Sequence, residues 1–505
     1  MGLPKNNWLI PLTLFAVTLL SRLPFTSELL YNLDSVQFAM AMEKYDVALH
    51  HPHPPGYFLY VMLAKVINGF VHDANASYVA MSLLFSGLTV VVIYYLGTAL
   101  FDEEVGRWAA VLGLTSPLLW FYGEVALTYI VEAFFSASIA LLCWRISKGE
   151  HRLIWWSAII LGISGGIRQN TPVFLLLLWL FSLRHIQLKR VVLALTVFVL
   201  VSFAWFVPMV VMTGGLERYS GALGALWVTQ NAPGTVFESG IEYRGKFLSA
   251  VGRFAFYGVG VGLFFLLLHL YSVIRKGLWR SFFEEKWLFF IFWIVPALLF
   301  YIFIHIHPGN PGFGLFYAPA LLILVPVSVS YIIEEAKRLF PGLSVTPKPI
   351  FFGVCGLLLI VHLYLFLFSS LPTSATEIRN HDARLSMILA NIRKDFSPAN
   401  TIISSKPYFL YSSWHTAYYL RDFAAYEEGY QYPELGRSLK IFHERAPFHP
   451  VNQITPPTEI EYLVYLIDPA DLAEKEFAEK EGLHRVDLDE ETFFYYDIFA
   501  HDRGS

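Results

Sequence analysis

Long apolar runs alternate with short polar segments along most of this chain. Runs close to the length that crosses a bilayer recur between Trp8 and Phe368. The first run lacks a small-residue cleavage pattern after Leu20, which predicts a retained anchor. From the spacing we expect about eleven crossings, at residues 8–25, 78–100, 108–122, 125–144, 153–167, 172–183, 191–212, 247–274, 287–304, 315–333 and 350–368.

The pattern changes after Leu371, where apolar runs shorten and charges return. Periodicity there predicts a soluble α/β domain over 372–505, beside a transmembrane domain over 1–371. Its expected elements are helices at 381–396, 408–420 and 469–481, strands at 401–404, 462–467, 484–488 and 492–498, and a Tyr-rich loop after residue 420.

Composition and charge agree with this division. Mean hydropathy is +0.51 and 56% of the residues are hydrophobic, more apolar surface than a soluble globule can bury. From Thr373 onward the chain has 13 Lys and Arg against 22 Asp and Glu, a net charge of 13 − 22 = −9, and the remainder carries 23 − 18 = +5. The acidity is expected to keep an external domain soluble, and an acidic binding face is the alternative.

The distribution of basic residues predicts the orientation. With the N-terminus in the cytoplasm, fifteen Lys and Arg of the membrane domain fall inside and eight outside. The first loop (about 26–76), a long loop (about 213–246), the 305–314 turn and the C-terminal domain are then extracytoplasmic. We expect the protein in the inner or plasma membrane.

The sequence gives no support for a cysteine-based metal site, a nucleotide-binding motif or a nucleic-acid-binding protein. The two cysteines, Cys143 and Cys355, are predicted near the cytoplasmic ends of their helices, where neither a disulfide nor a cysteine metal cluster is expected. The sequence has no phosphate-binding loop, no dinucleotide fingerprint and no basic nucleic-acid arm. Nucleic acid is therefore not an expected partner.

The first external loop concentrates polar chemistry between apolar segments. Asp34, His50, His51 and His53 lie where desolvation makes charge costly, which indicates a functional use. Asp34 precedes an interfacial helix, so capping that helix is the bland interpretation. The prolines around His53 exclude a helix and predict an extended run that points the imidazoles apart. No helical His-x-x-x-His pair is present, so no metal ligands are assigned, although a divalent metal stays open.

These residues resemble a known family. Asp34, a following helix with Phe38 and Ala41, and then His53-Pro54-Pro55-Gly56-Tyr57 before an apolar helix resemble the first external loop of the GT-C glycosyltransferases. The nearest branch contains the protein mannosyltransferases and aminoarabinose transferases. The resemblance implies a polyprenyl-phosphate sugar donor, Asp34 as the catalytic base or acceptor-orienting group, and His53 at the donor phosphate. Aminoarabinose transferases typically have Lys before Pro-Pro, so His53 would need a proton, or an arginine beside it.

Further candidates follow in the chain. The resemblance places an acidic residue opposite Asp34, and Glu124 fits that position best; a structural pair with Arg168 is the alternative. Glu132 follows about two turns later, within the membrane. The remaining expected donor or substrate contacts are His50, His51, Tyr57, Tyr129, Arg168, Arg244, His305 and His307.

Two groups among these candidates have ordinary structural explanations as well. Arg168, Arg244, Lys246 and Arg253 could clamp a lipid phosphate, because guanidinium groups bind phosphate oxygens in pairs. Interfacial anchoring explains Lys246 and Arg253 as well. His305, His307 and Tyr317 border a Gly/Pro-rich turn at 308–312 that could close over a site, or simply be a satisfied turn.

The sequence therefore predicts a polytopic α-helical membrane protein of GT-C type with a small extracytoplasmic α/β domain. Its predicted activity is transfer of a hexosyl or pentosyl group, with inversion, from a polyprenyl-phosphate donor to a glycan, lipid or protein acceptor. The alternatives are a proton-coupled transporter or flippase that uses Glu124 and Glu132, and an inactive scaffold.

Overall fold

The computed structural model describes residues 8–228, 234–340, 346–405, 413–429, 438–441, 450–451, 462–467, 484–488 and 493–498. The chain forms two compact units. The first, which we call the helical unit, contains Met1–Thr26 and Pro54–Glu377; the second, the sheet unit, contains Ser27–His53 and Ile378–Ser505. The segment 27–53 of the predicted first loop thus groups with the C-terminal residues.

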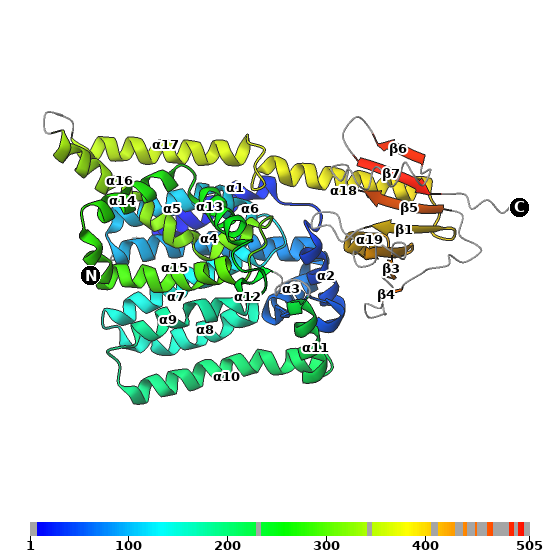
Figure 1. The fold of residues 1–505 in the computed structure, drawn as a ribbon, viewed down its shortest axis with the longest axis horizontal. Coiled ribbons are helices and arrows are strands. Elements are labelled where there is room, and N and C mark those ends of the chain that lie inside the picture. The colour runs from blue at the N-terminus through cyan, green and yellow to red at the C-terminus, as the bar shows by residue number, and fades with distance from the viewer. Residues whose placement is uncertain are drawn as a thin grey trace, which may run out of the picture. The chain divides into compact units, whose positions relative to one another are not determined.

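The helical unit is a bundle in which α7, α8, α9, α10 and α15 run side by side (Figure 1). Its helices are α1 (Leu9–Arg22), η1 (Leu23–Phe25), α3 (Phe58–Val71), α4 (Ala74–Leu100), α5 (Glu103–Thr115), α6 (Pro117–Tyr122), α7 (Tyr129–Ser147), η3 (His151–Leu153), α8 (Ile154–Ile167), α9 (Asn170–Ser182), α10 (Leu188–Met212), α11 (Leu216–Leu226), α12 (Val236–Ser239), α13 (Arg244–Val259), α14 (Gly262–Arg275), η6 (Leu278–Phe283), α15 (Glu285–Phe303), η7 (Pro311–Phe316), α16 (Ala318–Leu339) and α17 (Pro347–Leu367).

Six described helices are long and apolar enough to cross a membrane: α4, α7, α10, α15, α16 and α17. A seventh crossing is obtained if α13 and α14, bent by 116°, count as one. The bundle is that of a polytopic helical membrane protein. The shorter apolar helices include α1 with η1, α3 and α9, so the figure of about eleven crossings stays a prediction.

Two predicted continuous runs are broken in the structure. The run at 108–122 divides into α5 and α6, because the Ser116 hydroxyl accepts the Leu119 N–H at 3.4 Å and Pro117 begins a new helix. The run at 247–274 divides at Gly260, whose φ of 54° lies in the left-handed region. A hydropathy sum over a window of residues does not detect either break.

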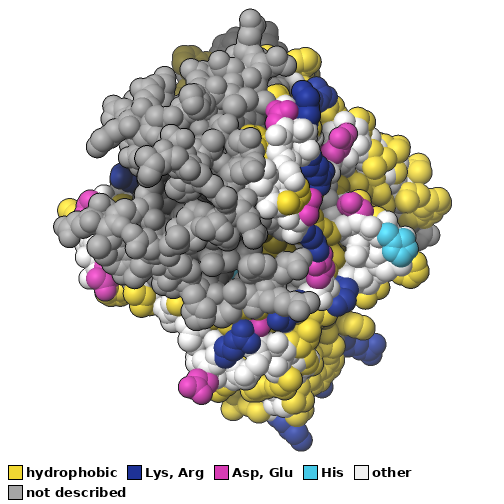
Figure 2. Space-filling view, turned by 90° about the vertical axis from the view of Figure 1, so that its right-hand side faces the viewer, with side chains coloured by type: hydrophobic (Ala, Val, Ile, Leu, Met, Phe, Trp, Pro, Cys, Tyr) yellow, Lys and Arg dark blue, Asp and Glu magenta, His cyan; other side chains and the backbone are white. Residues whose placement is uncertain are grey.

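The surface of the bundle is apolar, as a bilayer requires. Exposed large side chains follow α10 in particular, including Leu188, Val192, Leu200, Phe203 and Val211. Figure 2 shows hydrophobic side chains gathered into broad patches on the drawn face, with charged side chains beside them. Only lipid or another protein covers such a surface favourably.

The sheet unit is an α/β layer. It contains α2 (Leu33–Glu43), η2 (Val47–Leu49), α18 (Ala375–Asp395, from Ile378 onward), α19 (Ser413–Tyr419) and strands β1 (Thr401–Ser405), β2 (Ala424–Gly429), β3 (Ser438–Ile441), β4 (Pro450–Val451), β5 (Tyr462–Ile467), β6 (His484–Leu488) and β7 (Phe493–Ile498). The strand order is β4-β3-β2-β1-β5-β7-β6 (Figure 1).

The centre of this sheet is parallel. Strand β1 pairs in parallel with β2 and β5, and Ile402 lies opposite Ala424 and Leu463. Apolar side chains of α18, among them Leu385 and Ile392, pack against Ile403 of β1 and Val464 of β5. The predicted helices and strands at 381–396, 401–404, 408–420, 462–467, 484–488 and 492–498 correspond to α18, β1, α19, β5, β6 and β7. Strand β2 lies where a loop was expected, and the predicted helix at 469–481 lies outside the described residues.

Candidate active site

Asp34 lies in the first turn of α2, in the sheet unit. The cap of this helix is Asn32, whose side-chain oxygen accepts the Ser35 N–H at 3.1 Å. The interpretation of Asp34 as the N-cap is therefore wrong, because the helix begins two residues earlier than that interpretation requires. A carboxylate at this position is favoured by the partial positive charge of the helix N-terminus. The Asp34 side chain is therefore not the cap of α2.

His53 is the imidazole that faces this carboxylate. Its Nδ1 lies 3.6 Å from Oδ1 of Asp34, and the two side chains are only 16% and 18% exposed. The ring also packs beside Phe38 of the same helix, at 5.7 Å between centroids. This distance is slightly too long for a hydrogen bond, so the pair attracts strongly only when His53 is protonated. The structure thus brings one loop carboxylate beside one loop imidazole, a contact that the sequence analysis did not predict.

The other two loop histidines have different surroundings. The rings of His50 and His51 lie 6.4 and 6.0 Å from that of Trp414 in α19, and the backbones of His51 and Asp46 form an isolated bridge. Burial lowers the pKa of His51 to about 4, with Lys44 adding to the effect. His51 is therefore neutral at pH 7 and supplies no charge to a phosphate. The run is non-helical, as predicted, although it contains turns rather than one extended segment.

The motif continues into the helical unit at Pro54. The Pro55 carbonyl accepts hydrogen bonds from Gln169 Nε2 at 3.2 Å and from the Tyr219 hydroxyl at 3.1 Å. Gly56 has a φ of 120°, which a side chain would disfavour, and Tyr57 precedes α3 in a left-handed conformation. The Pro-Pro-Gly-Tyr turn is thereby fixed against α9 and α11.

Arg168 lies at the end of α8, beside Tyr57. Its guanidinium is 5.9 Å from the Tyr57 ring and 4.4 Å from the Tyr129 ring. Its Nε lies 3.1 Å from Glu132 Oε2, and its Nη1 donates to the Thr128 hydroxyl at 3.1 Å. Both charged side chains are more than nine-tenths buried. Because Glu132 compensates Arg168, the alternative that Glu124 pairs with Arg168 is wrong.

Glu124 lies at the α6–α7 turn, fully buried, and its electrostatic partner is Arg22 of α1. The Arg22 guanidinium is also buried; it donates to the Leu114 carbonyl at 3.0 Å and lies 5.2 Å from the Trp120 ring. The helical unit therefore contains two buried acid–arginine combinations, and the sequence left this role of Arg22 unrecognised.

The Gly/Pro-rich turn forms a hydrogen-bonded cap over Tyr129. Asn310 accepts the Tyr122 hydroxyl at 2.8 Å and donates to the Tyr129 hydroxyl at 2.5 Å. His305 lies 6.2 Å from the Phe313 ring, and burial, followed by the nearby His307 and Arg168, lowers its pKa to about 4. The exposed His307 retains contact with solvent. Asn310 and Tyr122 are site neighbours that the sequence reasoning missed, although Asn-Pro-Gly is a strong turn signal.

Two of the remaining cations, Arg244 and Arg253, donate to backbone carbonyl groups. Arg244 donates to the carbonyl groups of Ile302 and Gly234 and, at 3.3 Å, to the Ser239 hydroxyl. In the described part of the chain it has no ion pair, so its charge is not compensated by a carboxylate. Arg253 donates to the Pro308 carbonyl at 3.1 Å, whereas Lys246 is exposed and lies 5.3 Å from the Tyr243 ring.

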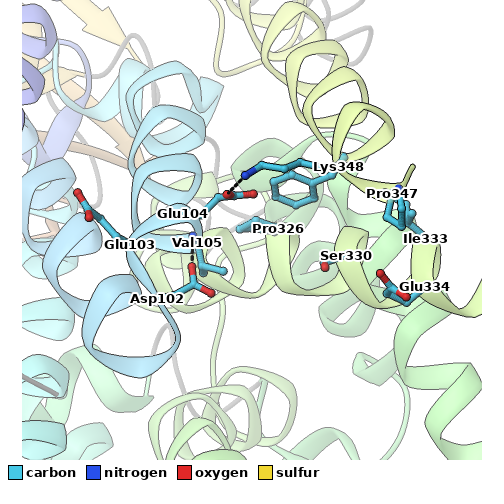
Figure 3. Close-up of a pocket in the computed structure, with 11 residues that line it drawn as sticks. Asp102, Glu103, Glu104, Val105, Pro326, Ser330, Ile333, Glu334, Pro347 and Lys348 are labelled. Atoms are coloured by element: carbon cyan, nitrogen blue, oxygen red, sulfur yellow. Dashed lines mark hydrogen bonds and ion pairs between the residues drawn. The ribbon is translucent and has the colours of Figure 1, made fainter. Parts of the chain in front are cut away.

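A separate pocket of about 510 Å³ is lined by α5, α16 and α17 (Figure 3). Asp102 accepts the Val105 N–H at 2.9 Å as the cap of α5, and Glu104 lies 3.5 Å from Lys348 Nζ. Asp102 and Glu104 thus have structural partners, and none of the predicted site residues lines the pocket. Among the described residues, no group of three or more His, Cys, Asp or Glu side chains could hold a metal ion.

The class of the fold follows from comparison with solved structures: the chain has a GT-C fold. One match is ArnT from Cupriavidus metallidurans bound to undecaprenyl phosphate, with a TM-score of 0.54, 13% identity and 98% of each chain covered. The same protein in the apo state matches with a TM-score of 0.51, 13% identity and 97% of each chain. No protein-family model and no curated protein matches the sequence.

Proposed function

We propose that this protein is an integral-membrane glycosyltransferase that takes its sugar from a polyprenyl-phosphate donor. The observation that carries the proposal is the full-length likeness to a protein crystallised with undecaprenyl phosphate. The pairing of Asp34 with His53 supports it from this chain's own residues. We further propose that the sheet unit and both ends of the 213–246 loop are extracytoplasmic and that the N-terminus is cytoplasmic, as the basic residues indicate.

Asp34 is proposed as the group that removes or orients the acceptor proton. The acceptor oxygen then attacks the anomeric carbon from the face opposite the phosphate, and that single displacement inverts the configuration. The bond to the phosphate oxygen breaks, and its electron pair leaves on the phosphate. Such a leaving group is already an anion and needs positive charge rather than a strong acid.

That charge is proposed to come from His53, protonated beside Asp34. Arg244 is the alternative, since no described carboxylate neutralises its guanidinium. Arg168 is less suited to a direct phosphate contact, since Glu132 already compensates it. Its proposed task is to position the rings of Tyr57 and Tyr129.

The transporter alternative requires Glu124 and Glu132 to exchange protons. Each carboxylate instead lies beside a buried arginine, as in a structural acid–arginine pair. The polar candidates also lie at loops and helix ends rather than along a path. These observations favour the transferase over the transporter.

The proposal is tested by transfer of a radiolabelled sugar from a set of polyprenyl-phosphate donors. We expect the Asp34→Asn variant to lose about 100- to 10,000-fold in rate, because it keeps the size of the side chain and removes the base. Glu28→Gln is the matched control, an exposed carboxylate of the same loop. Near-normal transfer by Asp34→Asn would refute the role of Asp34. The donor in the set from which label is transferred identifies the sugar. A chelator series addresses a divalent metal.

A further inference from the structure

One carboxylate of the C-terminal sequence accepts hydrogen bonds from the segment that leads into α2. Asp382 of α18 accepts the Ser27 hydroxyl at 2.9 Å and the Leu29 N–H at 3.4 Å on Oδ1, and the Glu28 N–H at 2.7 Å on Oδ2. Ser27 and Asp382 are 355 residues apart in the sequence and belong to the same compact unit. Hydrogen bonds to an ionised acceptor are roughly twice as strong as neutral ones.

The next residue is held by α19. The Leu30 N–H donates to the Tyr419 hydroxyl at 2.9 Å, and the Leu30 carbonyl accepts from His415 Nε2 at 2.9 Å. Burial lowers the pKa of His415 to about 3, so its neutral ring donates through Nε2. The polar backbone groups of a fully buried residue are thus satisfied by a second helix of the C-terminal sequence.

The far end of α2 is fixed as well. Glu43, the last residue of α2, forms two hydrogen bonds with the Arg421 guanidinium, at 3.0 Å and 2.5 Å. Helix α19 packs along α2 between these points. Asp34 therefore lies on a helix that is held at its entry, along its side and at its end by residues between 382 and 421.

From this arrangement we infer that Asp382 is a positioning residue for Asp34, and that the C-terminal α/β domain serves as the template that orients the catalytic loop. The inference rests on the proposed function, in which Asp34 acts on the acceptor. Asp34 is only five positions after Leu29, and the four intervening residues include the cap Asn32. A shift of about 1 Å in a reacting group costs about 100-fold in rate, so a fixed entry to α2 has kinetic consequences.

The anchor itself is tested without reference to activity. Hydrogen–deuterium exchange of the full-length protein in detergent is compared between wild type, Asp382→Ala and Asp382→Asn. We expect peptides over 27–37 to exchange at least tenfold faster in Asp382→Ala, with α4 peptides unchanged. Asp382→Asn retains one acceptor oxygen and should give an intermediate rate. Asp395→Ala, at the exposed end of the same helix, is the matched control. Equal exchange in wild type and Asp382→Ala overturns the anchor.

The positioning role is tested by kinetics. We expect Asp382→Ala to lower kcat about tenfold or more, with KM for the donor and Kd for polyprenyl phosphate within twofold of wild type, and Asp382→Asn to recover part of kcat. Faster exchange with an unchanged kcat overturns positioning. Should Asp382→Ala fail to fold, Asp382→Asn decides in the same way. A wild-type protein without any transfer refutes the proposed function, whereas the exchange result still decides the anchor.

Discussion

His51 and His53 are two residues apart and have opposite electrostatic surroundings. His51 is packed beside Trp414, and burial lowers its pKa to about 4. His53 instead faces the Asp34 carboxylate. The sequence could not distinguish them, because both are histidines before a proline. Only the environment of each ring, an indole for one and a carboxylate for the other, distinguishes them.

The buried neutral His51 makes the stability of the protein dependent on pH. Because its pKa is lower in the folded state than in the unfolded state, the unfolded chain binds more protons between about pH 6.5 and pH 4. Stability is fully present above this window and falls as the pH drops through it, by roughly 2–3 kcal/mol from this residue. Thermal unfolding followed between pH 7 and pH 4.5 measures the loss.

His51→Gln should flatten this pH dependence, since Gln does not titrate. His185→Gln, at an exposed position, is the control and should leave it unchanged. An equally steep loss in His51→Gln and in wild type would contradict the assignment.

At the scale of elements, Arg168 and Glu132 join the end of α8 to α7 inside the bundle. Thr171 of α9 adds a hydrogen bond to Glu132 Oε1 at 3.1 Å. Three helices thus meet at one compensated charge pair. A buried pair of this kind contributes little net stability over an apolar pair, but removal of one partner leaves a charge in a medium that cannot solvate it.

Arg168→Gln and Glu132→Gln should therefore each destabilise the protein by roughly 3–5 kcal/mol, and the double variant by less than the sum. Thermal unfolding of the wild type, the two single variants and the double variant in detergent measures these losses and the coupling between the two side chains. The control pair is Arg107 and Glu103, an exposed ion pair at 2.5 Å, where loss of one partner should cost at most about 1 kcal/mol. A stable Arg168→Gln variant with impaired donor binding would instead place Arg168 at the phosphate.

Element positions were largely predictable from the sequence, and the breaks within them were not. Hydropathy and periodicity are local sums, so they locate α4, α10 and β5 within a few residues. The division at Gly260 depends on a left-handed backbone beside His362, where a Cβ would lie 2.8 Å from the ring. A contact of that kind joins residues about a hundred positions apart, which an apolar window does not register.

At the scale of the whole molecule, the two compact units do not follow the order of the chain. The sequence predicts a division between residues 371 and 372, whereas the structure groups Ser27–His53 with the C-terminal residues. The peptide bond between His53 and Pro54 therefore joins the units inside the very motif that carries the family resemblance. Asp34 and His53 belong to one unit, and Tyr57, Glu124 and Arg168 to the other.

The predicted orientation has a direct test. Single cysteines at exposed positions, Glu28→Cys and Lys189→Cys, are treated with a membrane-impermeant maleimide in intact cells and in inverted vesicles. We expect Glu28→Cys to react only in cells and Lys189→Cys only in vesicles, because the basic residues predict opposite sides. Wild type is the control, since both native cysteines are buried. Labelling of the two positions from the same side would contradict the topology.

By itself, the sequence determined the class of the fold, the approximate positions of its helices and strands, and the loop that contains Asp34 and His53. Those features depend on apolar content, periodicity and a short motif, all of which are local. Tertiary structure alone decided that Arg168 pairs with Glu132, that Glu124 faces Arg22, and that Asp382 holds the entry to α2. Charges in a low-dielectric interior pair with whatever opposite charge the fold brings near, and that choice is made between residues far apart in the chain.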